Sequence, residues 1–183
     1  MSFSNEDKKD AVRYAYRLLS YRDRSAKELA DKLKWKGFSE ETIQQAINHL
    51  SEKGFINDTA LALSLRRIAE DAKLLGNLGV RIFLKRRGIP EGLISDAFTD
   101  DDSDEIIRAE KAVNKKLKSI ENYSEEEIKK KMWRFLVRKG YSFSTISRTL
   151  RQFKKKEEQI NEEKRGSFMC FNFRSLFSGS GLC

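Results

Sequence analysis

Apolar residues recur along the chain in a pattern that occurs three times, about fifty residues apart. Each copy is centred on a glycine, at Gly37, Gly88 and Gly140, with spacings of 51 and 52 residues. A leucine stands four positions before each glycine, and an apolar residue stands eight before and one, six and ten after it. A fixed period of this size is typical of a repeat protein, in which each unit buries its apolar face on its neighbour. The chain is therefore expected to hold three copies of one helical unit.

The first copy predicts three helices. Residues 6–19 carry apolar side chains at helical spacing. Ser25-Ala-Lys-Glu28 has the composition of a capping box, in which the serine accepts a first-turn amide hydrogen and the glutamate reaches back. The helix that begins there is expected to end at Gly37, because glycine suits a left-handed C-cap. Ser39 is expected to cap a third helix, which ends near Gly54.

The second copy begins at Asn57 and Asp58. We favour Asp58 as a helix cap, and the alternative is a hydrogen-bond anchor between the first and second units. Gly76 and Gly79 are expected to loosen the turn into the next helix. The acidic run 100–105 puts negative charge at the following helix N-terminus, where the helix dipole favours it. It lacks the spaced oxygen ligands of a calcium loop, so we interpret it as a helix-capping linker.

The third copy has the same order of elements. Its first helix is expected at about 106–117, and a second capping box at Ser124–Glu127 begins the next helix. The whole pattern predicts an all-α fold, an elongated array of three tandem three-helix repeats. We place the repeats at 1–55, 56–101 and 102–156, with a poorly ordered tail at 157–183.

The composition agrees with a helical protein that has a modest core. Of all residues, 39 % are hydrophobic and 36 % are charged, and Pro90 is the single proline. The sequence has no apolar run of the roughly 20 residues that a membrane span needs, and no secretory signal at its start. Both cysteines, Cys170 and Cys183, fall in the tail, so they supply neither a core disulfide nor a metal site. We expect a cytoplasmic protein with no membrane partner.

The net charge of +9 is concentrated in the third copy. Residues 128–156 contain eleven lysines and arginines and no acid. Such a run is usually a solubilising helix face, but the complete lack of neutralising acids favours contact with a polyanion. The residues predicted to contact nucleic-acid phosphates are Lys129, Lys130, Arg134, Arg138, Arg148 and Arg151.

Several spaced motifs agree, in order, with those of a known family. Arg22 to Phe38 resembles a signature opening, and Gly54 to Ala62 resembles a motif of glycine, short apolar link, aspartate and apolar-alanine pair. Gly76 to Leu84 with Arg87 to Ile89 resembles a second repeat, and Phe135 to Tyr141 a third. The family is RecX, regulators of the bacterial recombinase RecA, and the resemblance covers roughly residues 10–153. The chain departs from it at Leu61, where an aromatic is common, and in its Phe-rich tail.

The resemblance implies a partner and an activity. RecX-like proteins bind the filament that RecA forms on single-stranded DNA, and they restrain recombination, ATP hydrolysis and filament growth. We therefore expect a monomer that contacts the RecA filament and binds single- and double-stranded DNA without sequence preference. The candidate partner-binding residues in the first two units are Arg22, Arg24, Arg66, Arg67, Arg81, Lys85 and Arg86. For Arg22 and Arg24 the alternative is a solvated loop, and the main rival function is a sequence-reading helix-turn-helix DNA-binding protein.

The sequence gives little support for catalysis. His49 is the only histidine, and a lone histidine on a helix is more often a surface or half-buried side chain than a general base. No phosphate loop, nucleophile elbow or metal-ligand spacing is present in the sequence. We expect no enzymatic activity, no cofactor and no metal. Trp35 and Trp133 lie in basic surroundings and could stack on bases, although core packing is the simpler interpretation.

Overall fold

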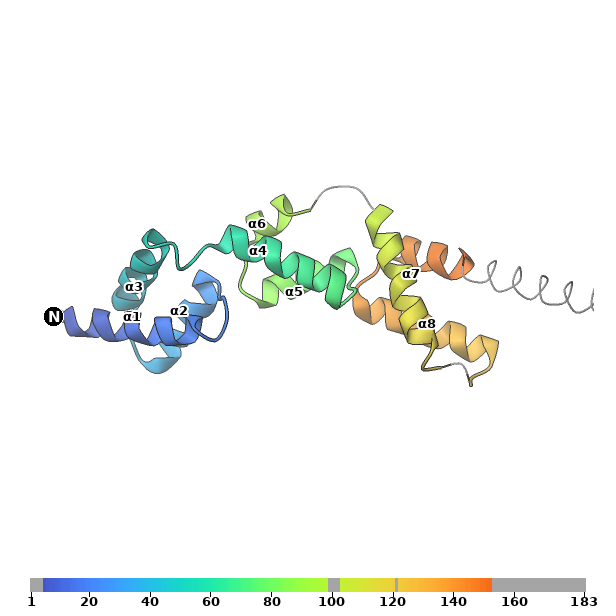
Figure 1. Ribbon diagram of the computed structural model, residues 1–183, viewed down its shortest axis with the longest axis horizontal. Coiled ribbons are helices and arrows are strands. Elements are labelled where there is room, and N and C mark those ends of the chain that lie inside the picture. Colours follow the sequence, from blue (N-terminus) through green and yellow to red (C-terminus); the bar gives the residue numbers. More distant parts are fainter. Residues whose placement is uncertain (1–4, 99–102, 121, 153–183) are drawn as a thin grey trace, which may run out of the picture.

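The computed structural model describes residues 5–98, 103–120 and 122–152. Every regular element in these residues is a helix, and the helices follow one another in three groups along the long axis of the molecule (Figure 1). The prediction of an all-α, elongated array of three three-helix repeats is therefore confirmed. The tail predicted at 157–183 lies outside the described residues.

The first unit consists of α1 (Asn5–Leu19), α2 (Ala26–Lys36) and α3 (Glu40–Glu52). The second consists of α4 (Asp58–Arg67), which continues into the π-helical turn η1 (Ile68–Ala72), then α5 (Asn77–Arg86) and α6 (Glu91–Asp96). The third begins with α7 (Ser103–Leu117) and α8 (Glu125–Lys139), and its last described helix spans residues 143–152.

Each unit has a hydrophobic core of its own. Leu33, Leu84 and Leu136, which stand four positions before the repeated glycines, are fully buried in the three separate clusters. The residues eight before the glycines and six after them are buried as well. Burying one such aliphatic side chain contributes roughly 1.5–3 kcal/mol. The period in the sequence is therefore the period of the core.

The three repeated glycines have the backbone conformation that the pattern predicts. Gly37, Gly88 and Gly140 have φ angles of 98°, 76° and 78°, a region that residues with a side chain rarely adopt. Gly37 and Gly140 are the left-handed C-caps of α2 and α8. Gly88 comes one residue later relative to α5, whose C-cap is Arg87.

The first and second units are joined by polar contacts at the start of α2. The hydroxyl of Ser25 donates a hydrogen bond of 2.8 Å to the Arg87 carbonyl oxygen. The Asp58 carboxylate accepts one of 3.0 Å from the backbone N–H of Ala26, whereas Asn57 caps α4. The preferred prediction for Asp58, a helix cap, is therefore wrong and the alternative, an anchor between units, is correct. An aspartate at this position can serve either purpose, and only the neighbouring unit decides which.

The capping box predicted at Ser25 is only half formed. Ser25 accepts the hydrogen bond from the backbone N–H of Glu28, as expected. The Glu28 carboxylate, however, pairs with Arg22, Arg24 and Arg87 instead of reaching back. Three guanidinium groups attract this carboxylate more strongly than one backbone amide does. The box at Ser124–Glu127 forms in full.

The second and third units meet through glycine backbones. The Gly76 N–H donates to the Lys139 carbonyl oxygen at 3.0 Å, and the Gly79 N–H donates to that of Gly140 at 3.3 Å. A methyl group on Gly79 would collide with the Lys139 carbonyl oxygen. Close approach of two backbones, and not a loosened turn, therefore explains the two glycines of the second unit.

Glu105 belongs to this same joint. Its side chain is only 2 % exposed, and its two carboxyl oxygens accept hydrogen bonds of 2.6 Å from the Asn77 N–H and the Thr145 hydroxyl. The interpretation of 100–105 as a capping linker is thus wrong for Glu105, which connects the second unit with both ends of the third. Asp100 to Asp102 lie outside the described residues.

Candidate nucleic-acid interface

The predicted phosphate-binding residues all lie on the surface of the third unit. Lys129, Lys130, Arg134, Arg138, Arg148 and Arg151 are exposed. Among the residues that the structure describes, none of the six forms an ion pair with a carboxylate. Lys130, Arg134 and Arg138 are four residues apart, so they form one stripe along α8. Their charges are therefore available to an external anion.

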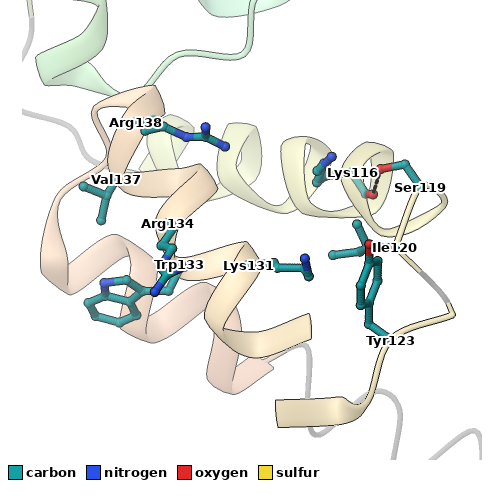
Figure 2. A pocket seen from close by; sticks show the side chains of 9 residues that line it. All are labelled: Lys116, Ser119, Ile120, Tyr123, Lys131, Trp133, Arg134, Val137 and Arg138. Carbon is teal, nitrogen blue, oxygen red and sulfur yellow. Dashed lines mark hydrogen bonds between the residues drawn. The ribbon is translucent and has the colours of Figure 1, made fainter. Parts of the chain in front are cut away.

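A shallow hollow of about 770 Å³ crosses the exposed face of α8 (Figure 2). Its lining includes four cationic side chains, one from the end of α7 and three from α8, and no acidic one. These cations are Lys116, Lys131, Arg134 and Arg138. The hollow is therefore an electropositive depression, of a volume within the range of roughly 300–1,000 Å³ that ligand sites have.

Two aromatic rings stand at opposite ends of this hollow, with Lys131 and Arg134 between them (Figure 2). Tyr123 is 45 % exposed, and the Lys131 ammonium lies 4.0 Å from the centre of its ring. Trp133 is half-buried and packs edge-on against Phe143, with ring centres 5.3 Å apart. Phe143 itself is 72 % exposed. Aromatic faces and cations therefore alternate across the surface.

A second, smaller hollow adjoins the first. It has a volume of about 470 Å³ and shares Trp133 and Arg134 with its neighbour. Lys129 and Lys130 line it together with one acid, Glu126. The two hollows thus connect four of the predicted phosphate-binding residues, Lys129, Lys130, Arg134 and Arg138, into one surface along α8.

Lys139, at the end of α8, is not part of this surface. Its ammonium donates a hydrogen bond to the Lys73 carbonyl oxygen across the joint between the second and third units. Burial, followed by the nearby charges of Lys115 and Lys73, lowers the pKa of Lys139. This lysine therefore has a structural role, unlike the exposed cations that precede it.

Several arginines predicted to bind a partner have internal contacts in the structure. Arg22 and Arg24 pair with Glu28. Arg66 pairs with Glu70 and donates to the Ala97 carbonyl oxygen. Their charges stabilise loops and joints of the first two units, and a further contact with a partner stays a prediction.

The remaining predicted partner-binding residues of the second unit either lie beside an aromatic ring or are exposed. The Arg81 guanidinium lies 4.4 Å from the centre of the Phe98 ring. Lys85 is 3.4 Å from a carboxylate oxygen of Glu91, in a pair that is largely exposed. Arg67 and Arg86 are exposed and form no ion pair within the described part of the chain. A partner could therefore reach Arg67, Lys85 and Arg86 without breaking a buried contact.

Two cations and one aromatic residue that line the larger hollow were not among the predicted site residues. Lys116, Tyr123 and Lys131 come from the end of α7, the loop and the first half of α8. An aromatic residue directly before a capping box, followed by a lysine-rich helix, was the available signal for Tyr123. Its meeting with Lys116 depends on the packing of α7 against α8, which no local pattern specifies.

Two other kinds of site have no support in the described residues. No group of three or more histidine, cysteine, aspartate or glutamate side chains there is placed to hold a metal ion. None of the helices that the structure describes is both long and apolar enough to span a membrane.

Two family models match the chain where the structure has its first and third units. They describe the first three-helix domain of RecX, over residues 11–50, and the third three-helix domain of RecX, over residues 103–150. The matched segments correspond to α1–α3 and to the unit that carries the hollows. The fold and the matches together define a regulatory protein built from tandem three-helix domains.

Sequence relatives agree with this class. The regulatory protein RecX of Chlorobaculum tepidum is 35 % identical over 144 residues, which cover 79 % of this chain and 88 % of the relative. The regulatory protein RecX of Legionella pneumophila is 34 % identical over 140 residues, which cover 76 % and 92 %. The chain belongs to the RecX family of regulatory proteins.

Solved structures share the arrangement of helices. The crystal structure of RecX from Lactobacillus salivarius has a TM-score of 0.70, covering 82 % of this chain and 99 % of that one. At 24 % identity it supports the fold alone. A second structure, of a regulatory protein RecX, has a TM-score of 0.69 at 27 % identity, covering 78 % of this chain and 72 % of that chain.

Proposed function

We propose that this protein is a noncatalytic inhibitor of the RecA recombinase that binds in the groove of the RecA–DNA filament. It restrains strand exchange, ATP hydrolysis and filament extension. Membership of the RecX family supports the choice of partner, and its relatives carry the name of regulatory proteins. The observation that carries the proposal is the set of exposed cations on α8 and the following helix, which form no ion pair with a carboxylate in the part of the chain that the structure describes.

The elongated array suits a target that is itself extended. Three units in a row can follow a filament groove and contact neighbouring recombinase subunits at once (Figure 1). The third unit tracks the DNA phosphates with Lys129, Lys130, Arg134, Arg138, Arg148 and Arg151. Inhibition is then mechanical, because a wedge between subunits blocks strand access and the subunit movements coupled to ATP turnover.

The first two units supply the contact with recombinase. On the second unit, Arg67, Lys85 and Arg86 are the residues that we assign to it, because they are exposed. The protein acts as a cytoplasmic monomer and binds single- and double-stranded DNA without sequence preference. Such binding weakens with salt, with a slope near 0.9 per neutralised phosphate on duplex DNA.

Inhibition is tested by measuring DNA-dependent ATP hydrolysis of the cognate recombinase at several ratios of this protein. We expect hydrolysis to fall at sub-stoichiometric ratios, because one array blocks several subunits. No change at any ratio would overturn the proposal. Tight, base-dependent binding to duplex DNA without recombinase would instead favour a sequence-reading DNA-binding protein.

The basic surface is tested by the double charge reversal Lys130→Glu and Arg134→Glu. Replacing two cations by two acids repels phosphates, so we expect DNA affinity and the inhibition of ATP hydrolysis to fall at least tenfold. Lys32→Glu with Lys36→Glu is the matched control, since both lysines are exposed on α2 at the same spacing. Equal effects of the two double variants would show that net charge, and not this surface, governs binding.

A further inference from the structure

We propose that the larger hollow on α8 is a base-stacking site, which binds unpaired nucleotides of single-stranded DNA in preference to duplex DNA. Tyr123 and Trp133 provide the stacking faces, and Lys131 and Arg134 hold the phosphate between them. The inference rests on the proposed DNA contact of the third unit. It adds a specificity that the phosphate-binding cations alone do not have.

The arrangement of side chains matches the repeating chemistry of a single strand. Such a strand presents a base, a phosphate and another base in succession, and the hollow presents a ring, two cations and another ring (Figure 2). Lys131 lies directly over the Tyr123 ring at 4.0 Å, so an aromatic surface and a positive charge act at one place. Proteins that bind single strands without sequence preference combine these same two elements.

The two rings differ in exposure, and core packing does not explain the position of Tyr123. Tyr123 is 45 % exposed and does not belong to the core cluster of the third unit. Trp133 packs partly on that cluster, and Phe143 contacts its ring edge-on. The contacts with the core and with Phe143 hold the indole in place, which lowers the entropy that binding would cost.

Base stacking distinguishes the two forms of DNA. In a duplex the faces of the bases are covered by their neighbours, so this surface can meet phosphates, sugars and base edges but no base face. In a single strand the faces are free, and stacking on aromatic side chains adds affinity whatever the base. We expect an unpaired strand to bind about tenfold more tightly than an abasic strand of equal charge.

The charges of the hollow select the occupant. None of its lining residues is acidic, so a polyanion is favoured. An acidic peptide would also meet the four cations, but its carboxylates would gain nothing from the two ring faces. Nucleic acid therefore uses the whole lining, and a peptide uses only part of it.

The first experiment uses the Trp35→Phe variant, which leaves Trp133 as the single tryptophan. Trp35 is 82 % exposed, so its replacement leaves the core intact. Three probes of equal length are titrated: oligo(dT), an abasic deoxyribose-phosphate strand and a duplex. Stacking predicts that oligo(dT) quenches Trp133 fluorescence and binds about tenfold more tightly than the abasic strand, while the other two probes cause little quenching.

The second experiment compares Tyr123→Leu with Tyr21→Leu, an exposed tyrosine of the first unit. Tyr123→Leu is expected to lower oligo(dT) affinity severalfold and to leave abasic-strand affinity unchanged, whereas Tyr21→Leu changes neither. An oligo(U) arm should behave like oligo(dT), because the rings contact the bases and not the sugar.

The outcomes separate this inference from the proposed function. Equal affinity of the parent protein for oligo(dT) and the abasic strand would overturn the stacking site, and inhibition of the recombinase could still stand. Tighter binding of poly-glutamate than of oligo(dT) would identify an acidic peptide as the occupant. Lack of effect on recombinase ATP hydrolysis would overturn the proposed function, whatever the fluorescence shows.

Discussion

At the scale of single residues, Glu28 is one of the groups that join the first two units. Its carboxylate pairs with Arg22 and Arg24 of its own unit and with Arg87 of the next. Burial, the largest single influence, raises the pKa of Glu28. The Arg22 hydrogen bond and the charges of Arg22, Arg87 and Arg24 together bring that pKa below its ordinary value of 4.5.

The lowered pKa makes stability depend on pH in a definite direction. A carboxyl group with a depressed folded-state pKa stabilises the fold above its ordinary value of 4.5, and this stabilisation disappears as the pH falls through the lowered pKa. We expect Glu28→Gln to reduce the free energy of unfolding by about 1 kcal/mol at pH 7, because its partners are partly exposed. The difference from the parent protein should shrink toward zero in acid, as followed by urea unfolding between pH 7 and pH 3.

Glu52→Gln is the control for this measurement, because Glu52 is exposed at the end of α3 and forms no ion pair within the described residues. It should leave stability unchanged at both pH values. A Glu28→Gln deficit that is equally large at pH 3 would show that lost packing, and not charge, is responsible.

The contacts of these residues could be predicted from the sequence only in part. The serine of the first capping box was predicted because its hydrogen bond is local, whereas the glutamate was misjudged because Arg87 comes from the next unit. Glu105 was interpreted as part of a linker, because the sequence near it does not predict its hydrogen bond with Thr145, forty residues away. Hydrogen bonds between residues a few positions apart could be predicted, whereas contacts between units could not, apart from the anchor at Asp58, which was one of two alternatives.

At the scale of elements, the joint between α5 and α8 depends on the absence of side chains. The N-terminus of α5 meets the C-terminus of α8 through hydrogen bonds from Gly76 and Gly79 to the carbonyl oxygens of Lys139 and Gly140. A methyl group on Gly79 would meet the backbone of Lys139, which has no flexible end to move aside. Substitution there must push the helices apart or bend one of them.

We expect Gly79→Ala to destabilise the protein by about 2–3 kcal/mol, despite the higher helix propensity of alanine. Amide exchange at Gly76 should accelerate at least tenfold, because its hydrogen bond to Lys139 is lost as the helices separate. Gly92→Ala in α6 is the matched control. No atom lies near its added methyl group, so it should be neutral or stabilise by up to about 1 kcal/mol.

If Gly79→Ala proved as harmless as Gly92→Ala, the close packing of α5 on α8 would be refuted.

The sequence predicted both helices and the left-handed glycine that ends α8, because the period and the cap are local signals. It assigned the wrong reason to Gly79, because a glycine needed for backbone contact looks the same as one needed for a turn. The hollow on α8 could be predicted only in part: Arg134 and Arg138 were predicted, whereas Lys116, Tyr123 and Lys131 were not.

At the scale of the whole molecule, the array consists of three separate cores connected mainly by polar contacts, although Leu74 of the second unit also packs against the third core. The buried clusters share no residue, and hydrogen bonds and ion pairs cross between units at Ser25, Glu28, Asp58 and Glu105. Such joints contribute less per residue than buried aliphatic side chains do, because their groups are also well solvated in the unfolded chain. Stability is therefore close to a sum over units, with modest coupling between neighbours.

This organisation predicts that damage to one core stays largely within its unit. Leu136 is fully buried in the third unit, so Leu136→Ala should cost about 3 kcal/mol there. Hydrogen exchange followed by mass spectrometry should then show strongly accelerated exchange in α8 and little change in α2. The reciprocal variant Leu33→Ala should expose α2 and spare α8. Equal acceleration in both helices by either variant would mean that the joints transmit the full loss, and the array would then unfold as one cooperative body.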